Sequence, residues 1–196
     1  LPKGGDTVEK TAVQKLAGAL KVLVTITLVC NLVALLLVPG MSLMKGPEEL
    51  LALTPYENPL EVPLRVGIAF VLSWGWVWTA GVYEVVLALF LLFCGICTAV
   101  ILWQGRRVLG TILTGAPFRA ENGVSLRRAA VCCFLIAAAA LARVVWGLFY
   151  YGSVAPLLTY NALFVPIFIL GGLLCLVMSA LFRQAAELKA ENDLTI

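Results

Sequence analysis

Four long stretches of hydrophobic residues, separated by shorter polar segments, dominate the sequence. They cover residues 16–38, 82–103, 126–151 and 160–182. A helix needs about 20 apolar residues to cross the hydrocarbon core of a bilayer, and each stretch reaches about that length. The pattern therefore predicts an all-α integral membrane protein, in which four transmembrane helices form one bundle and one membrane domain over residues 1–196.

Composition supports the same class of protein. Hydrophobic residues make up 62% of the chain and charged residues 13%, and the mean hydropathy is +1.01. Soluble domains carry about 25% charged residues. The net charge of +3 is small and the basic residues lie at span ends, so we expect membrane lipids, and no nucleic acid, as direct partners.

The segment between the first two stretches, residues 39–81, is a small external loop in this interpretation. Its first half contains several prolines, which argue against a long helix. Residues 66–80 are too few to cross the bilayer comfortably, and Trp74, Trp76 and Trp78 alternate with a period of two. We predict a β-hairpin or irregular strand pair at the membrane surface, with the three tryptophans on one face. A re-entrant or short fifth helix is the alternative.

Residues that stop helices mark the expected ends of the spans. Pro39-Gly40 is expected to end the first span, and Gly105-Arg106-Arg107 to end the second. A loop of turn-forming residues then occupies 104–125, before the third span. After the fourth span, residues 183–196 are predicted to form a charged helical tail that unwinds at Asn192-Asp193.

The distribution of positive charge predicts the orientation. Most basic residues lie at span ends that share one side with the two termini, whereas the 39–81 segment holds only Lys45 and Arg65. Short loops rich in Lys and Arg stay in the cytoplasm. We therefore expect both termini, the 104–125 loop and the tail to be cytoplasmic.

Two short motifs lie on this predicted cytoplasmic side. One comprises Pro117, Phe118, Glu121 and Asn122 after Gly115, with Arg127 after Leu126; the other comprises Phe182, Arg183, Leu188, Glu191, Asn192, Asp193, Leu194, Thr195 and Ile196. Together they resemble the bacterial four-span membrane family catalogued as domain of unknown function 2975. That family has a G-x-P-F-x-x-E-N loop between spans two and three and closes on F-R-x-G-x-x-L-x-x-E-x-D-L-T-I/V. Ala185 stands where that pattern usually has glycine.

The resemblance implies a multi-pass protein of the bacterial cytoplasmic (inner) membrane, and it carries no established activity to transfer. Members of the family are often encoded beside a small helix-turn-helix regulator. This association implies a signalling partnership with a cytoplasmic protein.

Arg143 is the one basic residue well inside a span, which makes it a candidate functional position that needs a partner. We expect Glu84, near the outer end of span two, to pair with it. Trp146 and Tyr150 share a helix face with Arg143 and are placed to stack on its guanidinium group. Two interpretations stay open: a structural ion pair between spans two and three, and a polar site open to the outside.

The charged tail also has two interpretations. It is either a solvated helix end, or a latch in which Glu191, Asp193 and the carboxylate of Ile196 fold back onto arginines at 106, 107, 119, 127 or 128. The arginines themselves are expected to set the orientation. Lipid head groups are a further candidate ligand for them.

The sequence contains no recognisable set of catalytic or metal-binding residues. Histidine is absent, and the six cysteines all lie in apolar runs, where Cys94 and Cys97 are expected to serve as small packing residues. We predict no enzyme, no metal and no cofactor. Gly171-Gly172 and Ser179-Ala180 favour close helix contact within the bundle, with a homo-oligomer as the alternative.

The leading functional hypothesis is a regulatory or sensory membrane component. It would couple an external or lipid signal to a cytoplasmic partner such as a helix-turn-helix regulator. The alternative is a small transporter or an accessory subunit of a larger membrane complex. Paired broken helices would indicate a transporter, and the sequence offers Pro166 without an evident second break.

Overall fold

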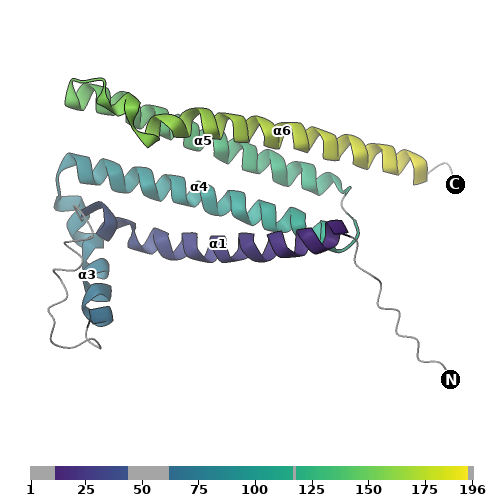
Figure 1. Cartoon of the computed structure of the whole chain (residues 1–196), viewed down its shortest axis with the longest axis horizontal. Coiled ribbons are helices and arrows are strands. Elements are labelled where there is room, and N and C mark those ends of the chain that lie inside the picture. Colours follow the sequence, from purple (N-terminus) through teal and green to yellow (C-terminus); the bar gives the residue numbers. More distant parts are fainter. Residues whose placement is uncertain (1–11, 44–61, 117, 194–196) are drawn as a thin grey trace. The chain divides into compact units, whose positions relative to one another are not determined.

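The computed structural model describes residues 12–43, 62–116 and 118–193, which are entirely helical apart from short connections (Figure 1). No strand occurs among these residues. The elements in chain order are α1 (Ala12–Leu43), α3 (Val62–Trp76), the 3-10 turn η1 (Val77–Thr79), α4 (Val82–Leu113), α5 (Ala120–Tyr151), the 3-10 turn η2 (Ala155–Leu158) and α6 (Tyr160–Asp193).

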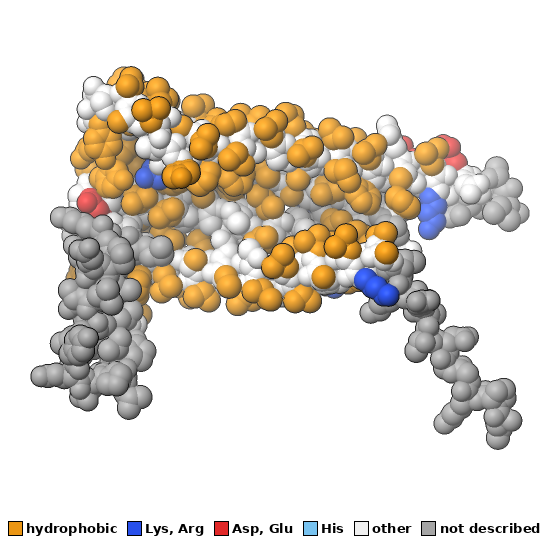
Figure 2. Space-filling view, in the orientation of Figure 1, with side chains coloured by type: hydrophobic (Ala, Val, Ile, Leu, Met, Phe, Trp, Pro, Cys, Tyr) orange, Lys and Arg blue, Asp and Glu red, His pale blue; other side chains and the backbone are white. Residues whose placement is uncertain are grey.

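Four of these helices, α1, α4, α5 and α6, are long and apolar enough to cross a membrane. Many of their large hydrophobic side chains are exposed, such as Phe149 at 84% and Leu174 at 66%. Figure 2 shows hydrophobic side chains over most of the coloured surface along the long helices. Exposing so much apolar surface to water would cost about 25 cal/mol per Å², whereas lipid chains accept it. The protein is therefore a multi-pass membrane protein, as the hydrophobic pattern predicts.

The predicted hairpin at residues 66–80 is wrong, because these residues form α3 and η1 instead. Pro63 is compatible with this helix because it lies in the first turn, where no helical partner accepts the missing N–H. On a helix, Trp74 and Trp76 lie about 200° apart, so they do not share one face. Trp78 follows in η1, and all three indoles are exposed. The short fifth helix named as the alternative is the one observed.

Two helices run past the residues expected to end them. α1 continues through Pro39 to Leu43, and Ser42 Oγ donates a hydrogen bond to the Pro39 carbonyl at 2.8 Å. α4 continues past Gly105 and ends at Leu113, and Gly115, two residues later, has a left-handed φ of 73°. Gly115 N–H donates to Ile112 O at 3.2 Å and Ala116 N–H to Thr111 O at 3.1 Å, which is a Schellman cap.

The described residues divide into two compact units, and each long helix contributes one part to each. The basic unit contains residues 12–28, 100–134 and 169–193, and the Arg143 unit contains residues 29–43, 62–99 and 135–168. Apart from Arg65 and Arg143, all basic residues of the described chain belong to the basic unit.

In the basic unit, small residues let α5 and α6 approach each other closely. Ser179 Oγ donates a hydrogen bond of 2.6 Å to the carbonyl of Gly123, and both residues are buried. Gly172 faces Phe134: a Cβ added there would lie 2.8 Å from Phe134 Cε1. Residues 172 and 179, expected from the sequence to favour close helix contact, do so between these two helices.

In the Arg143 unit, α1, η1 and α4 pack around Val38, Val77 and Ala88. The polar side chains at these contacts are satisfied by backbone carbonyls. Asn31 Nδ2 donates to Gly95 O at 3.0 Å, and Trp74 Nε1 donates to Leu36 O at 3.0 Å. The first bond joins α1 to α4, and the second joins α3 to α1. They also satisfy polar groups whose burial in apolar surroundings without a partner would cost free energy.

Candidate functional site

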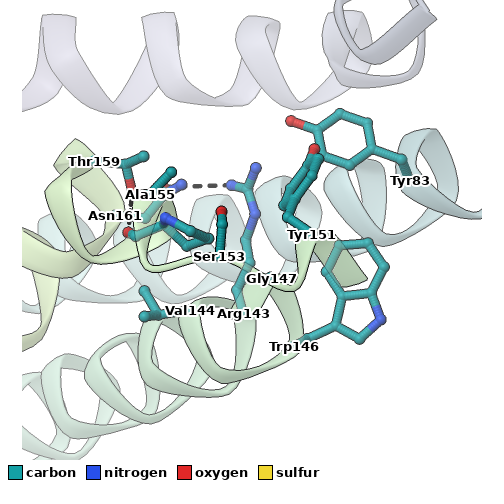
Figure 3. A pocket seen from close by; sticks show the side chains of 11 residues that line it. Tyr83, Arg143, Val144, Trp146, Gly147, Tyr151, Ser153, Ala155, Thr159 and Asn161 are labelled. Atoms are coloured by element: carbon teal, nitrogen blue, oxygen red, sulfur yellow. Dashed lines mark hydrogen bonds between the residues drawn. The ribbon is translucent and has the colours of Figure 1, made fainter. Parts of the chain in front are cut away.

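Arg143 lies in a hollow of about 310 Å³ in the Arg143 unit (Figure 3). Its Nη1 donates to Asn161 Oδ1 of α6 at 3.4 Å, and its guanidinium carbon lies 4.7 Å from the ring centroid of Phe90 of α4. Among the described residues, no ion pair joins Arg143 to Glu84. The carboxylate of Glu84 turns back to Gly81 at the start of α4 instead. The arginine therefore has a neutral partner where the sequence predicts an acidic one.

Aromatic residues form one side of this hollow. The ring centroids of Tyr83 and Trp146 are 6.3 Å apart at an interplanar angle of 28°, and those of Tyr83 and Tyr151 are 6.4 Å apart. Figure 3 shows the guanidinium group between Asn161 on one side and the rings of Tyr83 and Tyr151 on the other.

Trp146 and Tyr150, which the sequence places beside Arg143, stack on each other, with centroids 4.8 Å apart. The ring that the guanidinium faces is Phe90, which sequence analysis missed. Phe90 stands among other apolar residues of span two, and nothing local distinguishes it from its neighbours. Only the packing of α4 against α5 brings it to Arg143.

The connection between α5 and α6 forms another side of the hollow. α5 ends at Tyr151 and is followed by Gly152, whose φ of 59° is left-handed and whose N–H donates to Leu148 O at 3.0 Å. Ser153, Pro156 and Thr159 then line the hollow. Gly147 permits this return of the chain, because a Cβ there would lie 3.2 Å from Pro156 Cγ.

The hollow has the chemistry of an anion site with apolar walls. One guanidinium supplies positive charge, and its hydrogen-bond partner is an uncharged amide at a distance typical of a weak bond. No acidic residue lines the hollow among the residues described. A carboxylate or phosphate there would form charge-assisted hydrogen bonds with the guanidinium, and a flat apolar group would contact the aromatic side.

The motif residues of the 104–125 loop and the tail come together in the basic unit. Phe118 and Phe182 lie with ring centroids 6.3 Å apart. Asn122 is 1% exposed, and its Nδ2 donates to Thr111 Oγ1 at 2.7 Å. Glu121 lies 3.7 Å from Arg107. These contacts hold the α4–α5 connection in place and bring it against α6.

The remaining motif residues are only partly described. Arg127 and Arg183 are exposed, and Glu191 and Asn192 lie in the last turn of α6, which ends at Asp193. Pro117, Leu194, Thr195 and Ile196 lie outside the described residues. The described part of the tail is helical through Asp193, and its folding back onto the arginines stays a prediction.

No disulfide joins the six cysteines, and within the described ranges no group of three or more His, Cys, Asp or Glu side chains is placed to hold a metal ion. Cys97 and Cys133 are buried, and the other four are intermediate or exposed.

The four apolar helices, with their motif contacts between α4, α5 and α6, define a four-span membrane protein. The family model described as "Protein of unknown function (DUF2975)" matches residues 54–196, which include both motifs. The chain belongs to this family, as its motifs predict. A search of curated proteins and a search of solved structures gave no match.

Proposed function

We propose that the protein is a sensory or regulatory component of the bacterial inner membrane. It binds a small anionic ligand beside Arg143 and passes the state of this site to a cytoplasmic protein partner, such as a helix-turn-helix regulator. The observation that supports this most directly is an arginine inside a membrane span whose hydrogen-bond partner is neutral.

A charge in such a position is costly, and residues of this kind usually serve a function. An anion about 4 Å from the guanidinium would gain about 4 kcal/mol of Coulomb energy at an effective dielectric constant of about 20. The hollow of about 310 Å³ lies at the lower end of the range for small-molecule sites, about 300–1,000 Å³. The ligand class that fits is a small carboxylate or phosphate with an aromatic or apolar body.

The charge distribution supports the orientation that this function needs. Basic residues gather in the basic unit, which also contains both ends of the described chain and the motif contacts. By the positive-inside rule, this unit faces the cytoplasm. Phe118, Arg127 and Arg183 are exposed there and offer a mixed apolar and basic surface to a partner.

The test is affinity capture of the full chain from native membranes, with both proteins and small molecules identified by mass spectrometry. We compare the wild type with Arg143→Gln, which keeps a polar side chain and removes the charge. Arg128→Gln, an exposed arginine outside the hollow, is the matched control. A small anion should co-purify with the wild type and the control, and be lost from Arg143→Gln.

A photo-crosslinking residue at position 118 then reports the partner directly. The yield of the crosslinked partner should change when the ligand is added to the wild type, and should not respond in Arg143→Gln. Failure to capture any cytoplasmic protein would refute the regulatory function. An equal response in both proteins would refute the coupling.

One observation favours the alternative of a small transporter. Pro39 lies inside α1 and Pro166 inside α6, so two of the four long helices contain an internal proline, and both prolines belong to the Arg143 unit. A proline inside a helix removes one backbone hydrogen bond. Uptake of the captured anion into proteoliposomes, dependent on Arg143, would identify a transporter instead of a sensor.

A further inference from the structure

A second hollow, of about 390 Å³, lies in the basic unit between α1 and α4. Lys21 of α1 and Trp103, Arg106, Arg107 and Gly110 of α4 line it. Three of these five residues carry a positive charge. Lys21 lies next to Gly110, since a Cβ added there would lie 3.6 Å from Lys21 Nζ, in ordinary contact.

The position of this hollow along α4 corresponds to the edge of the membrane. From Val82, where α4 begins, to Trp103 the helix rises about 32 Å at about 1.5 Å per residue, which is close to the thickness of the hydrocarbon core, about 30 Å. Trp103 is 57% exposed, and tryptophan favours the interface between hydrocarbon and head groups. Arg106 and Arg107 follow within one helical turn, at the depth of lipid phosphates.

The cations of this hollow are only weakly compensated. Glu121 lies 3.7 Å from Arg107, but the two side chains are 67% and 52% exposed, so water and salt screen the pair strongly. The guanidinium carbon of Arg106 lies 5.8 Å from the ring centroid of Trp103, a contact that orients the guanidinium without neutralising it. A planar guanidinium matches phosphate oxygens in a bidentate geometry.

We propose that this hollow binds the phosphate group of an anionic phospholipid in the adjacent leaflet. Arg106, Arg107 and Lys21 contact the phosphate, and the acyl chains follow α4 along Trp103 and Val100. Val100, Trp103 and Arg107 are spaced three and four residues apart, so they share one helix face, and all three are exposed. A free phosphate ion would use the cations alone, whereas a lipid also accounts for the exposed indole and the apolar surface next to it.

The test is lipid binding by the purified full chain in a neutral detergent, measured by native mass spectrometry. The probes are phosphatidylglycerol and phosphatidylcholine with identical acyl chains. The variant K21Q/R106Q/R107Q removes the three cations of the hollow. The control K15Q/R119Q/R128Q removes one lysine and two arginines that are exposed in the same unit and do not line it.

We expect the hollow variant to lose affinity for phosphatidylglycerol on the order of 100-fold, since each basic residue near anionic lipid contributes a factor of about five. The control should change less than about threefold. Equal losses in both variants would show a general attraction to basic surface and would overturn the proposal.

A second variant tests the hollow while keeping every charge. Gly110→Phe fills the space beside Lys21. Phenylalanine has a higher helix propensity than glycine, so the substitution does not weaken the helix. It should lose most of the selectivity for phosphatidylglycerol over phosphatidylcholine, and unchanged selectivity would refute a bound head group. Competition by millimolar inorganic phosphate at constant ionic strength would likewise overturn the lipid assignment. Arg143→Gln should leave this lipid binding intact, so the lipid site and the proposed sensory function are tested separately.

Discussion

Replacing Asn122, in the first turn of α5, by alanine should destabilise the protein. Asn122 is 1% exposed, and its Nδ2 donates a 2.7 Å hydrogen bond to Thr111 Oγ1. Thr111 Oγ1 in turn donates to Val108 O at 2.7 Å. The bond therefore links the start of α5 to the last turns of α4.

The magnitude follows from what each replacement leaves behind. Asn122→Ala removes a buried side chain and its hydrogen bond, which should cost about 1–2 kcal/mol. Thr111→Val keeps the volume but leaves the buried amide of Asn122 without this acceptor, at a cost of about 1–3 kcal/mol. Because both remove the same bond, the double variant should cost less than the sum of the two, with a coupling energy of about 0.6–1 kcal/mol.

The assay is reversible unfolding in mixed detergent micelles, followed by circular dichroism for the wild type, the two single variants and the double variant. Glu121→Gln is the control, because Glu121 is the exposed neighbour and its ion pair with Arg107 should contribute less than about 0.5 kcal/mol. Additive single effects, or a cost for Asn122→Ala no larger than that of the control, would refute the structural role of this hydrogen bond.

Two further pairs of variants test helix packing and α3 by the same unfolding measurement. Gly172→Leu should destabilise the protein by about 1–3 kcal/mol, because the leucine side chain would collide with the Phe134 ring. Its control is Gly105→Ala, which should be neutral or stabilising by up to about 1 kcal/mol because a Cβ at Gly105 meets no atom within 4 Å. If Gly105→Ala were the more destabilising of the two, the close contact at Gly172 would be refuted. Trp74→Phe should cost about 1 kcal/mol through loss of the bond to the Leu36 carbonyl, whereas Trp76→Phe should cost little, and equal effects would contradict the placement of α3.

The sequence predicts the helices well because their signal is long and local. About 20 consecutive apolar residues identify a span without any knowledge of its neighbours. The ends of the helices are harder to predict from the sequence, because a glycine is compatible with a helix interior as well as with a cap. Gly105 and Gly115 look alike in the sequence, and only Gly115 adopts the left-handed conformation that closes α4.

The error at residues 66–80 has a similar origin. Three tryptophans in alternation resemble a strand, but the residues before Trp74 are apolar almost without a break, so they carry no period of their own. In such a short run, backbone hydrogen bonds within the segment are satisfied most simply by a helix when the surroundings are apolar.

The candidate site was predictable in part. Arg143 is identified from the sequence because a charge within a span is rare. Its partners cannot be identified in this way. Asn161 lies 18 residues after Arg143, and Phe90 lies in α4. Nothing in the sequence around either residue distinguishes it from its neighbours. The sequence identifies the residues of the family motif but not what they contact. The structure shows that Phe118 packs near Phe182 and that Asn122 is hydrogen-bonded to Thr111, so two motif residues have a structural role.

The amide partner of Arg143 determines how the hollow distinguishes between ligands. A carboxylate partner would neutralise the guanidinium charge and repel an anion, whereas the amide of Asn161 adds no net charge. A neutral analogue of the ligand with the same shape would lose the Coulomb attraction to Arg143 and keep only its contacts with the aromatic side. The hollow therefore selects its ligand by charge as well as by shape.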